Sequence, residues 1–311
     1  MDRFLIPAAD ECRNIVAKED YAENVSMAQL CTFQAGGPAA CFVSPDGEDQ
    51  LRAVLGVCRK YGVPHQIFGR GSNFLFADSG YRGIVIGMRK HFSGLSADPE
   101  TGIVTAQAGA LLSAAAQSAL AASLTGLEFA SGIPGTAGGG VRMNAGAYGG
   151  EMKQVLIDVT AMDEGGKIHA VSAEDADLSY RHSLFAENGW VILSCRMQLA
   201  HGDPEAIRAA MNDLNSRRRA KQPLEYGSAG STFLRPAGHF AGQLIEQAGL
   251  MGYTVGGARV SEKHAGFVIN GGNATASDIM AVIRHVQAEV LRTSGVRLET
   301  EVCLAGDFDE E

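Results

Sequence analysis

Two glycine-rich stretches are the first candidates for a functional site, because their backbone N–H groups could bind an anion. The longer stretch runs from Gly126 to Gly150, GLEFASGIPGTAGGGVRMNAGAYGG, and has neither a helical nor a strand period. Glycine permits positive φ and close approach of the backbone, but it loses much entropy on ordering, so an ordered run needs a compensating partner. Because successive N–H groups in turns can hold phosphate oxygens, the stretch indicates a loop that binds an anionic ligand.

A flexible linker is the alternative interpretation of this stretch. Residues such as Ile133, Pro134, Val141 and Tyr148 are not the Ser, Gln and Glu that flexible linkers favour. The shorter stretch, GRGSN at 69–73, is a second candidate phosphate cradle. The dinucleotide fingerprint GxGxxG fails there because Phe74 takes the sixth position, and GxxxxGK[ST] is absent, so a Rossmann domain and a P-loop are disfavoured.

Polar side chains that could act on a ligand occur in three separate places. LSYRHS at 178–183 is a polar cluster with one aromatic, and YGSAGSTFLR at 226–235 contains serines but no GxSxG nucleophile elbow. In the predicted last strand, Val296 to Leu304, alternation places Arg297, Glu299, Glu301 and Cys303 on the polar face. Each of the three is open to a structural or a functional interpretation, as are Lys263 and His264.

Regular elements are predicted around these stretches. Apolar spacing and end signals predict helices over 49–62, 111–124, 240–248 and 275–293, and a further one from Asp203 through the basic run at 217–219. Strands are predicted over 41–43, 63–68, 74–76, 83–88, 103–108 and 190–199, with a hairpin of 155–162 and 167–171. Separate helices, hairpins and short strands favour an α+β fold over a doubly wound parallel sheet.

Composition narrows the function classes. The chain has 311 residues, so two or three subdomains are expected, and its net charge of −9 makes nucleic acid or an anionic membrane an unfavourable partner. No segment approaches the roughly 20 apolar residues of a spanning helix, which indicates a cytoplasmic protein. The six cysteines lack a CxxC pair, so we expect reduced thiols and no metal site. No sequence feature predicts an obligate protein partner.

Several motifs taken together resemble one family. These are GRGSNFLF (69–76), GLEFASGIPGTAGGGVRMNAGAYG (126–149), YRHSLF (180–185), RRRAKQPLEYGSAGSTF (217–233) and LETEV (298–302), in the family's order. They resemble the UDP-N-acetylenolpyruvoylglucosamine reductases, flavoenzymes of peptidoglycan precursor synthesis. The resemblance implies a two-part FAD-binding domain of the vanillyl-alcohol-oxidase (PCMH) type and a smaller α/β substrate-binding domain.

The resemblance also implies domain limits and cofactor contacts. The first FAD part would take 1–88 with the C-terminal strand 297–311, the second would take 89–202, and the substrate domain would take 203–296. Both glycine stretches would hold FAD. The implied FAD contacts are Gly69, Arg70, Gly71, Ser72, Asn73, Ile133, Pro134, Gly135, Thr136, Gly138, Gly139, Asn144, Ala145 and Gly146.

For the chemistry, the resemblance implies that NADPH reduces FAD and that hydride then passes to UDP-N-acetylglucosamine enolpyruvate. Arg181 would bind the enolpyruvyl carboxylate, Ser231 would donate the proton, and Glu301 would stabilise the enolate. Tyr180 would support Arg181 or the substrate, Lys221 would lie near the substrate diphosphate, and Arg235 is a further candidate contact with the UDP-sugar.

Two features depart from the family pattern. No room exists between Tyr180 and Trp190 for the long tyrosine loop of one branch, so the chain resembles the type that lacks it. Cys303 stands where many relatives have arginine, and Arg142 and Arg235 stand where other residues are common. Two alternatives stay open: another flavoenzyme on the same FAD fold, such as an alcohol or sugar oxidase, and a non-catalytic nucleotide-binding module.

Overall fold

The computed structural model describes residues 4–308. By its internal contacts the described chain forms two compact units: unit 1 comprises 4–22, 42–70 and 84–218, and unit 2 comprises 23–41, 71–83 and 219–308. The ends of the predicted first FAD-binding part, residues 1–3 and 309–311, lie outside the described residues. The two units are described separately.

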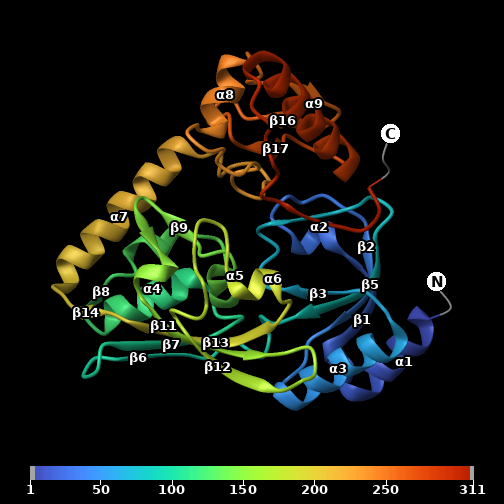
Figure 1. The fold of residues 1–311 in the computed structure, drawn as a ribbon, viewed down its shortest axis with the longest axis vertical. Helices are drawn as coiled ribbons and strands as arrows, with labels where there is room; N and C mark the ends of the chain where they lie inside the picture. The colour runs from blue at the N-terminus through green and yellow to red at the C-terminus, as the bar shows by residue number, and fades with distance from the viewer. Residues whose placement is uncertain (1–3, 309–311) are drawn as a thin grey trace. The chain divides into compact units, whose positions relative to one another are not determined.

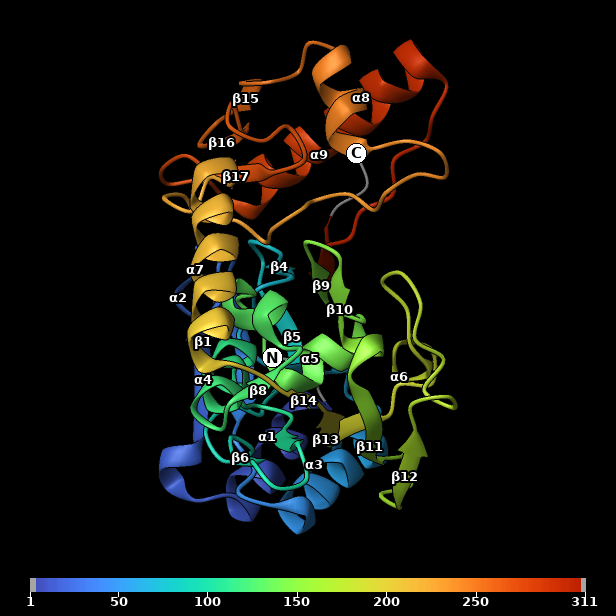
Figure 2. The same cartoon turned by 90° about the vertical axis from the view of Figure 1, so that its left-hand side faces the viewer.

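A five-stranded antiparallel sheet is the framework of unit 1. In spatial order its strands are β12 (Ile168–Ser172), β11 (Leu156–Met162), β13 (Val191–Gln198), β7 (Ile103–Gln107) and β6 (Leu95–Asp98). β11 and β12 pair antiparallel, which confirms the predicted hairpin. The helices α4 (Leu112–Ala121) and α5 (Ala137–Arg142) contact strands of this sheet (Figure 2).

α5 corrects the prediction that the whole glycine-rich stretch is loop. Its sequence, AGGGVR, is unfavourable for a helix because glycine has the lowest propensity after proline. Packing explains why it forms. An added Cβ at Gly138 would lie 2.8 Å from the Cβ of Ala108, and one at Gly140 would lie 3.0 Å from Cδ1 of Leu112. The glycines therefore let this helix approach its neighbours more closely than side chains would permit.

Unit 1 also contains a pair of helices that lie side by side, α1 (Leu5–Ile15) and α3 (Glu48–Tyr61), as Figure 1 shows. α3 confirms the helix predicted over 49–62, and Gly62 ends it in the left-handed conformation at φ 62°. Cys58 is buried, as expected from its place in the apolar stripe. A further four-stranded sheet, which is not confined to the residues of unit 1, has the order β1 (Tyr21–Ser26), β2 (Pro38–Val43), β5 (Tyr81–Gly87) and β3 (His65–Phe68).

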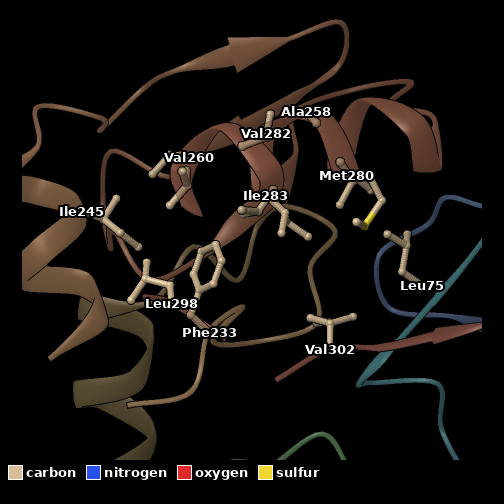
Figure 3. Close-up of a cluster of buried hydrophobic side chains, with 14 of the residues drawn as sticks. Leu75, Phe233, Ile245, Ala258, Val260, Met280, Val282, Ile283, Leu298 and Val302 are labelled. Carbon is tan, nitrogen blue, oxygen red and sulfur yellow. The ribbon is translucent and has the colours of Figure 1, made fainter. Parts of the chain in front are cut away.

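Unit 2 is built around α9 (Ala276–Ser294), which packs on α8 (Ala241–Gln247) and on the small antiparallel sheet of β15 (Thr254–Val255), β16 (Ala258–Val260) and β17 (Val268–Asn270). The apolar core includes Phe233, Leu298 and Ile283, and Figure 3 shows the first two side chains pointing toward the third on α9. The predicted capping box is present, since Thr275 accepts from the Asp278 N–H and Asp278 accepts from the Thr275 N–H.

The predicted last strand is only partly correct. Leu298 and Val302 are buried and Glu299 is exposed, as the alternation requires, but the segment before Cys303 is extended rather than part of a sheet. The strand itself is β18 (Cys303–Ala305), which pairs parallel to β4 (Phe74–Phe76), and Leu304 is 40% exposed. Buried and exposed residues therefore alternate up to Val302 although this segment is not a strand. In the actual strand, β18, the alternation stops, since Cys303 and Leu304 are both exposed.

The remaining elements are short, except for α7 (Pro204–Lys221), which is the predicted helix that begins at Pro204 and includes the basic run. They are α2 (Met27–Leu30), α6 (Leu184–Glu187), β8 (Leu124–Thr125), β9 (Gly146–Ala147), β10 (Gly150–Glu151), β14 (Ala200–His201), and the 3-10 turns at Lys18–Asp20, Glu128–Gly132 and Met152–Gln154. Antiparallel sheets with separate helices confirm the α+β class. Within 4–308 no helix has the length and apolar character to cross a membrane.

Candidate functional site

Gly69 and Thr136 bring the two glycine stretches together in unit 1. An added Cβ at Gly69 would lie 2.6 Å from Oγ1 of Thr136, so only glycine fits there. Thr136 is 3% exposed, and its hydroxyl accepts from the N–H of Gly139 at 3.4 Å as the cap of α5. The two stretches are far apart in the sequence, and they meet where the backbone of Gly69 lies against the side chain of Thr136.

A cavity of about 220 Å³ lies beside this contact, and all its lining residues belong to unit 1. They are Arg70, Leu111, Ser113, Ser131, Gly132, Ile133, Pro134 and Gly135. Within 4–308 the N–H groups of Gly135 and Thr136 donate to no other residue, so they are available to an anionic ligand. Bare backbone, unused N–H donors and an arginine fit the diphosphate of a dinucleotide such as FAD.

The other predicted FAD contacts divide between the units. Gly69 and Arg70 belong to unit 1, whereas Gly71, Ser72 and Asn73 belong to unit 2. Ala145 uses its backbone inside unit 1, donating to Gly140 and accepting from Met152. An added Cβ at Gly146 would lie 2.7 Å from the carbonyl oxygen of Gly150 in the β9–β10 hairpin.

Asn144 ties the end of the glycine-rich helix to the polar cluster that follows β12. It is 2% exposed and has φ 40°, a left-handed conformation that asparagine tolerates. Its Nδ2 donates to the carbonyl oxygen of Ser179 and to Oε2 of Glu151, both at 3.1 Å. Its Oδ1 accepts from the N–H of Lys153 at 2.9 Å. The side chain thus contacts three separate points of unit 1.

Arg181 lies in a tight turn whose two ends are both held. Ser179 and His182 exchange backbone hydrogen bonds of 3.2 Å, and Arg181 between them has φ 55°. Ser183, which is fully buried, donates from Oγ to the carbonyl oxygen of Arg142 at 2.6 Å. The Arg181 guanidinium lies 5.4 Å from the ring centroid of Tyr180, within the range of a cation–π contact. The turn therefore holds the backbone of Arg181 in place beside an aromatic ring that is half exposed.

In unit 2, Ser231 and Glu301 come from two segments that pair through their backbones. Thr232 accepts from the Glu301 N–H and Leu234 donates to the Glu299 carbonyl oxygen, both at 2.9 Å. Thr232 is fully buried; its N–H donates to Gly266 and its Oγ1 accepts from the Val268 N–H, each at 2.9 Å. Ser231 and Glu301, which are 70 residues apart in the sequence, therefore lie on two neighbouring backbone segments.

Asn73, from the first glycine motif, also contacts the Glu301 segment. Its Nδ2 donates to the Glu301 carbonyl oxygen at 2.9 Å, and its own carbonyl oxygen accepts from the Cys303 N–H at 2.9 Å. No local sequence pattern predicts this contact, because the two residues are 228 positions apart. A predicted cofactor residue and a predicted catalytic residue thus share one local structure in unit 2.

The cations of unit 2 lie near the same segment. Burial first, and then the positive charge of Lys221, hold the pKa of His264 below its ordinary value. The His264 loop supplies the Gly266 carbonyl oxygen that binds Thr232, so this loop supports the Ser231 segment. Lys263 pairs with Glu225 at 3.5 Å. The Arg235 guanidinium lies 4.9 Å from the ring centroid of Phe240, which is 59% exposed.

One residue with functional potential was missed from the sequence. Arg218 belongs to the basic run at the end of α7, and cations at a helix C-terminus have an ordinary explanation because they complement the helix dipole. Arg217 fits that interpretation, since it pairs with Asp213 at 2.7 Å on the surface. Arg218 instead lies against Gly132 beside the cavity. Glycine at 132 and a basic helix end are weak signals separately, and only the fold brings them together.

Comparison with known proteins gives a consistent result over nearly the whole chain. Residues 39–172 match the FAD binding domain family, and residues 222–305 match the C-terminal domain of UDP-N-acetylenolpyruvoylglucosamine reductase. The cavity residues 70–135 lie inside the first match, and Ser231 and Glu301 lie inside the second.

Individual relatives agree. The UDP-N-acetylenolpyruvoylglucosamine reductase of Clostridium novyi is 47% identical and covers 96% of both chains, and that of Agathobacter rectalis is 48% identical over 91% of this chain and 93% of its own. The solved structure of the Thermus caldophilus enzyme is similar at a TM-score of 0.79, with 33% identity, covering 91% of this chain and 98% of its own. The chain therefore belongs to the UDP-N-acetylenolpyruvoylglucosamine reductase family, a family of FAD-containing oxidoreductases.

Proposed function

We propose that the protein uses NADPH to reduce UDP-N-acetylglucosamine enolpyruvate to UDP-N-acetylmuramate in the cytoplasm. Membership of the reductase family and the match to an FAD-binding domain support the reaction class. When bound, FAD supplies the chemistry of accepting a hydride from NADPH and giving it to C3 of the enol ether. The protein's own residues must then bind the substrate and manage the charge and proton at C2.

The backbone pairing of the Ser231 and Glu301 segments is the observation that carries this proposal. Hydride addition at C3 leaves negative charge on C2 and the adjoining carboxylate, so the site needs a proton donor and an acidic or cationic stabiliser. The hydrogen bond from the Glu301 N–H to the Thr232 carbonyl oxygen supports a shared role for hydroxyl and carboxyl on one substrate. Ser231 donates the proton to C2, and protonated Glu301 stabilises the enolate oxygen.

Arg181 binds the enolpyruvyl carboxylate. A guanidinium keeps its charge at every working pH and offers two parallel donors to a carboxylate. The reciprocal bonds of Ser179 and His182 limit the movement of this residue, so little entropy is lost when it binds. Tyr180, Lys221 and Arg235 contact the remainder of the UDP-sugar.

The proposed domain limits follow from the family resemblance. Residues 1–88 with 297–311 form the first FAD part, 89–202 the second, and 203–296 the substrate domain. The matched ranges, 39–172 for FAD binding and 222–305 for the reductase C-terminal domain, support a limit between the FAD-binding parts and the substrate domain near residue 203, while the second match continues past 296.

Anaerobic half-reactions with the purified protein test the proposal. NADPH should bleach the flavin absorbance, and the enolpyruvyl UDP-sugar should restore it while yielding a product two hydrogens heavier. Restoration by oxygen alone, with no change in the mass of the UDP-sugar, would instead identify an oxidase of the same fold. A colourless protein that binds nucleotide without flavin would identify a non-catalytic module.

A further inference from the structure

Arg218 is a partly buried cation beside the cavity of unit 1. An added Cβ at Gly132 would lie 3.2 Å from Cδ and 3.6 Å from Nη1 of Arg218, so the side chain runs alongside the backbone of this glycine. Asn215, one helical turn earlier, donates to the hydroxyl of Ser131 at 3.2 Å. One face of α7 therefore packs on Ser131 and Gly132, which both line the cavity.

The guanidinium of Arg218 has no protein partner to neutralise it. Among residues 4–308 it forms no ion pair and no hydrogen bond, whereas the adjacent Arg217 pairs with Asp213. Burial lowers the pKa of Arg218, and an electrostatic interaction with Tyr148 acts in the opposite direction. A cation that is partly removed from water and lies against the backbone of a cavity-lining glycine is well placed for an anionic partner from outside the chain.

Arg70 is an exposed cation that lines the same cavity. It lines the cavity together with Ser131 and Gly132, and within the described range it also forms no ion pair. Two guanidinium groups without carboxylate partners, near serine hydroxyls and the unused N–H of Gly135, favour a ligand with phosphate oxygens. Arginine matches such oxygens well because its donors form a planar fork.

We propose that Arg218 is a phosphate-binding residue that holds the diphosphate of bound FAD, acting with Arg70 at the cavity lined by Ser131 and Gly132. The inference rests on the FAD content of the proposed function, and it adds a residue from α7, outside the range that matches the FAD-binding family. α7 thereby contributes to cofactor binding as well as leading into the proposed substrate domain.

The affinity of the apoprotein for two flavins tests this role without turnover. FAD carries a diphosphate and riboflavin carries none, and flavin fluorescence reports the binding of both. Arg218→Met should weaken FAD binding by about tenfold to a hundredfold, the usual effect of losing a hydrogen-bonded contact with a charged group. The same substitution should leave riboflavin affinity unchanged, and Arg218→Lys should recover part of the loss.

Arg217→Met is the matched control, because Arg217 is adjacent and exposed and pairs only with Asp213. It should leave both affinities at the wild-type value. The proposal is overturned if Arg218→Met weakens FAD and riboflavin equally, since the effect is then structural. It is also overturned if FAD affinity is unchanged while the KM for NADPH or the UDP-sugar rises, since the phosphate bound is then that of another ligand.

This test is separate from the test of the proposed function. Turnover of the enolpyruvyl UDP-sugar by the wild-type holoenzyme decides the reaction, whatever Arg218 does. A wild type that turns over, with Arg218→Met binding FAD normally, refutes only the role of Arg218. A wild type that binds FAD but does not reduce the UDP-sugar refutes only the proposed reaction.

Discussion

Asn144 donates a hydrogen bond from Nδ2 to the carbonyl oxygen of Ser179, 3.1 Å away, and so joins the glycine-rich segment to the turn that carries Arg181. The same amide group binds Glu151 and Lys153. All the hydrogen bonds found for this side chain are made within unit 1. The position of the Arg181 turn therefore depends on a residue that the family resemblance had assigned to flavin binding.

Asn144→Gly tests this dependence without adding backbone strain, because glycine accepts the φ of 40° at this position. Losing the buried amide should destabilise the protein by about 1–3 kcal/mol. It should also slow flavin reoxidation by the UDP-sugar more than flavin reduction by NADPH, since only the former needs Arg181. Glu151→Gln, which keeps an acceptor oxygen, should have a milder effect on both. A raised FAD dissociation constant with an unchanged reoxidation rate would show that Asn144 acts on the cofactor.

Ser231→Ala should separate the two half-reactions. Flavin reduction by NADPH should stay near the wild-type rate, while reoxidation by the UDP-sugar should slow by about a hundredfold or more, the typical contribution of a positioned proton donor. Stopped-flow absorbance at the flavin band measures both. Ser228→Ala is the matched control in the same turn, because Ser228 contacts Thr32 only through its backbone. Equal traces for the two variants would remove Ser231 from the mechanism.

His264 should make stability depend on pH. Its pKa is lowered by burial and then by the charge of Lys221, so the unfolded chain binds its proton more tightly than the folded protein. Stability from this residue is therefore present above the unfolded value, about 6.5, and is lost as pH falls through the lower folded pKa. Denaturant unfolding at pH 7.5 and at lower pH should show this loss, and His264→Gln should reduce it. NMR titration of Lys221→Met should show a raised His264 pKa; an unchanged value would place Lys221 away from this ring.

Cysteine reactivity should be confined to one residue. Cys303 is exposed, whereas Cys12, Cys31, Cys41, Cys58 and Cys195 are buried. Burial raises the pKa of Cys31 and of Cys195 to about 12, which leaves almost no thiolate at neutral pH. Iodoacetamide should therefore label the native protein once, and Cys303→Ser should abolish the rapid labelling. Mass spectrometry of the modified peptides identifies which cysteines are labelled. Rapid labelling at two or more positions would contradict the burial pattern.

Local signals predicted the elements that depend on local interactions. α3 and α9 follow from apolar spacing, and the ends of α9 follow from the Thr275 capping box and from Gly295 in the left-handed conformation. α5 could not be predicted in this way, because its glycines are unfavourable for a helix except where Ala108 and Leu112 approach them closely. For the predicted last strand, the sequence pattern was present but most of the strand was not. The burial alternates there because the segment contacts Phe233 and Thr232, and not because it belongs to a sheet.

The candidate site likewise contains residues that the sequence motifs identified and residues that only the fold brings into view. The motifs identified Ser231, Glu301 and Arg181 through the family resemblance, and the pairing of the first two segments supports their roles. Arg218 could not be found, since a basic helix end has an ordinary electrostatic explanation and its contact with Gly132 depends on the packing of α7. Asn73 was expected to act through its loop backbone, and its bond to the Glu301 carbonyl oxygen depends on long-range pairing.

The central claim is that Ser231 and Glu301 act together on the UDP-sugar and on no other step. A double-mutant cycle of Ser231→Ala and Glu301→Gln, followed by single-turnover reoxidation of the NADPH-reduced enzyme, measures it most directly. The account predicts that each variant keeps normal reduction by NADPH and that the double variant is scarcely slower in reoxidation than the slower single one, because residues that act as a unit are not additive. Two losses that multiply fully, or a matching loss in the reduction step, would contradict it.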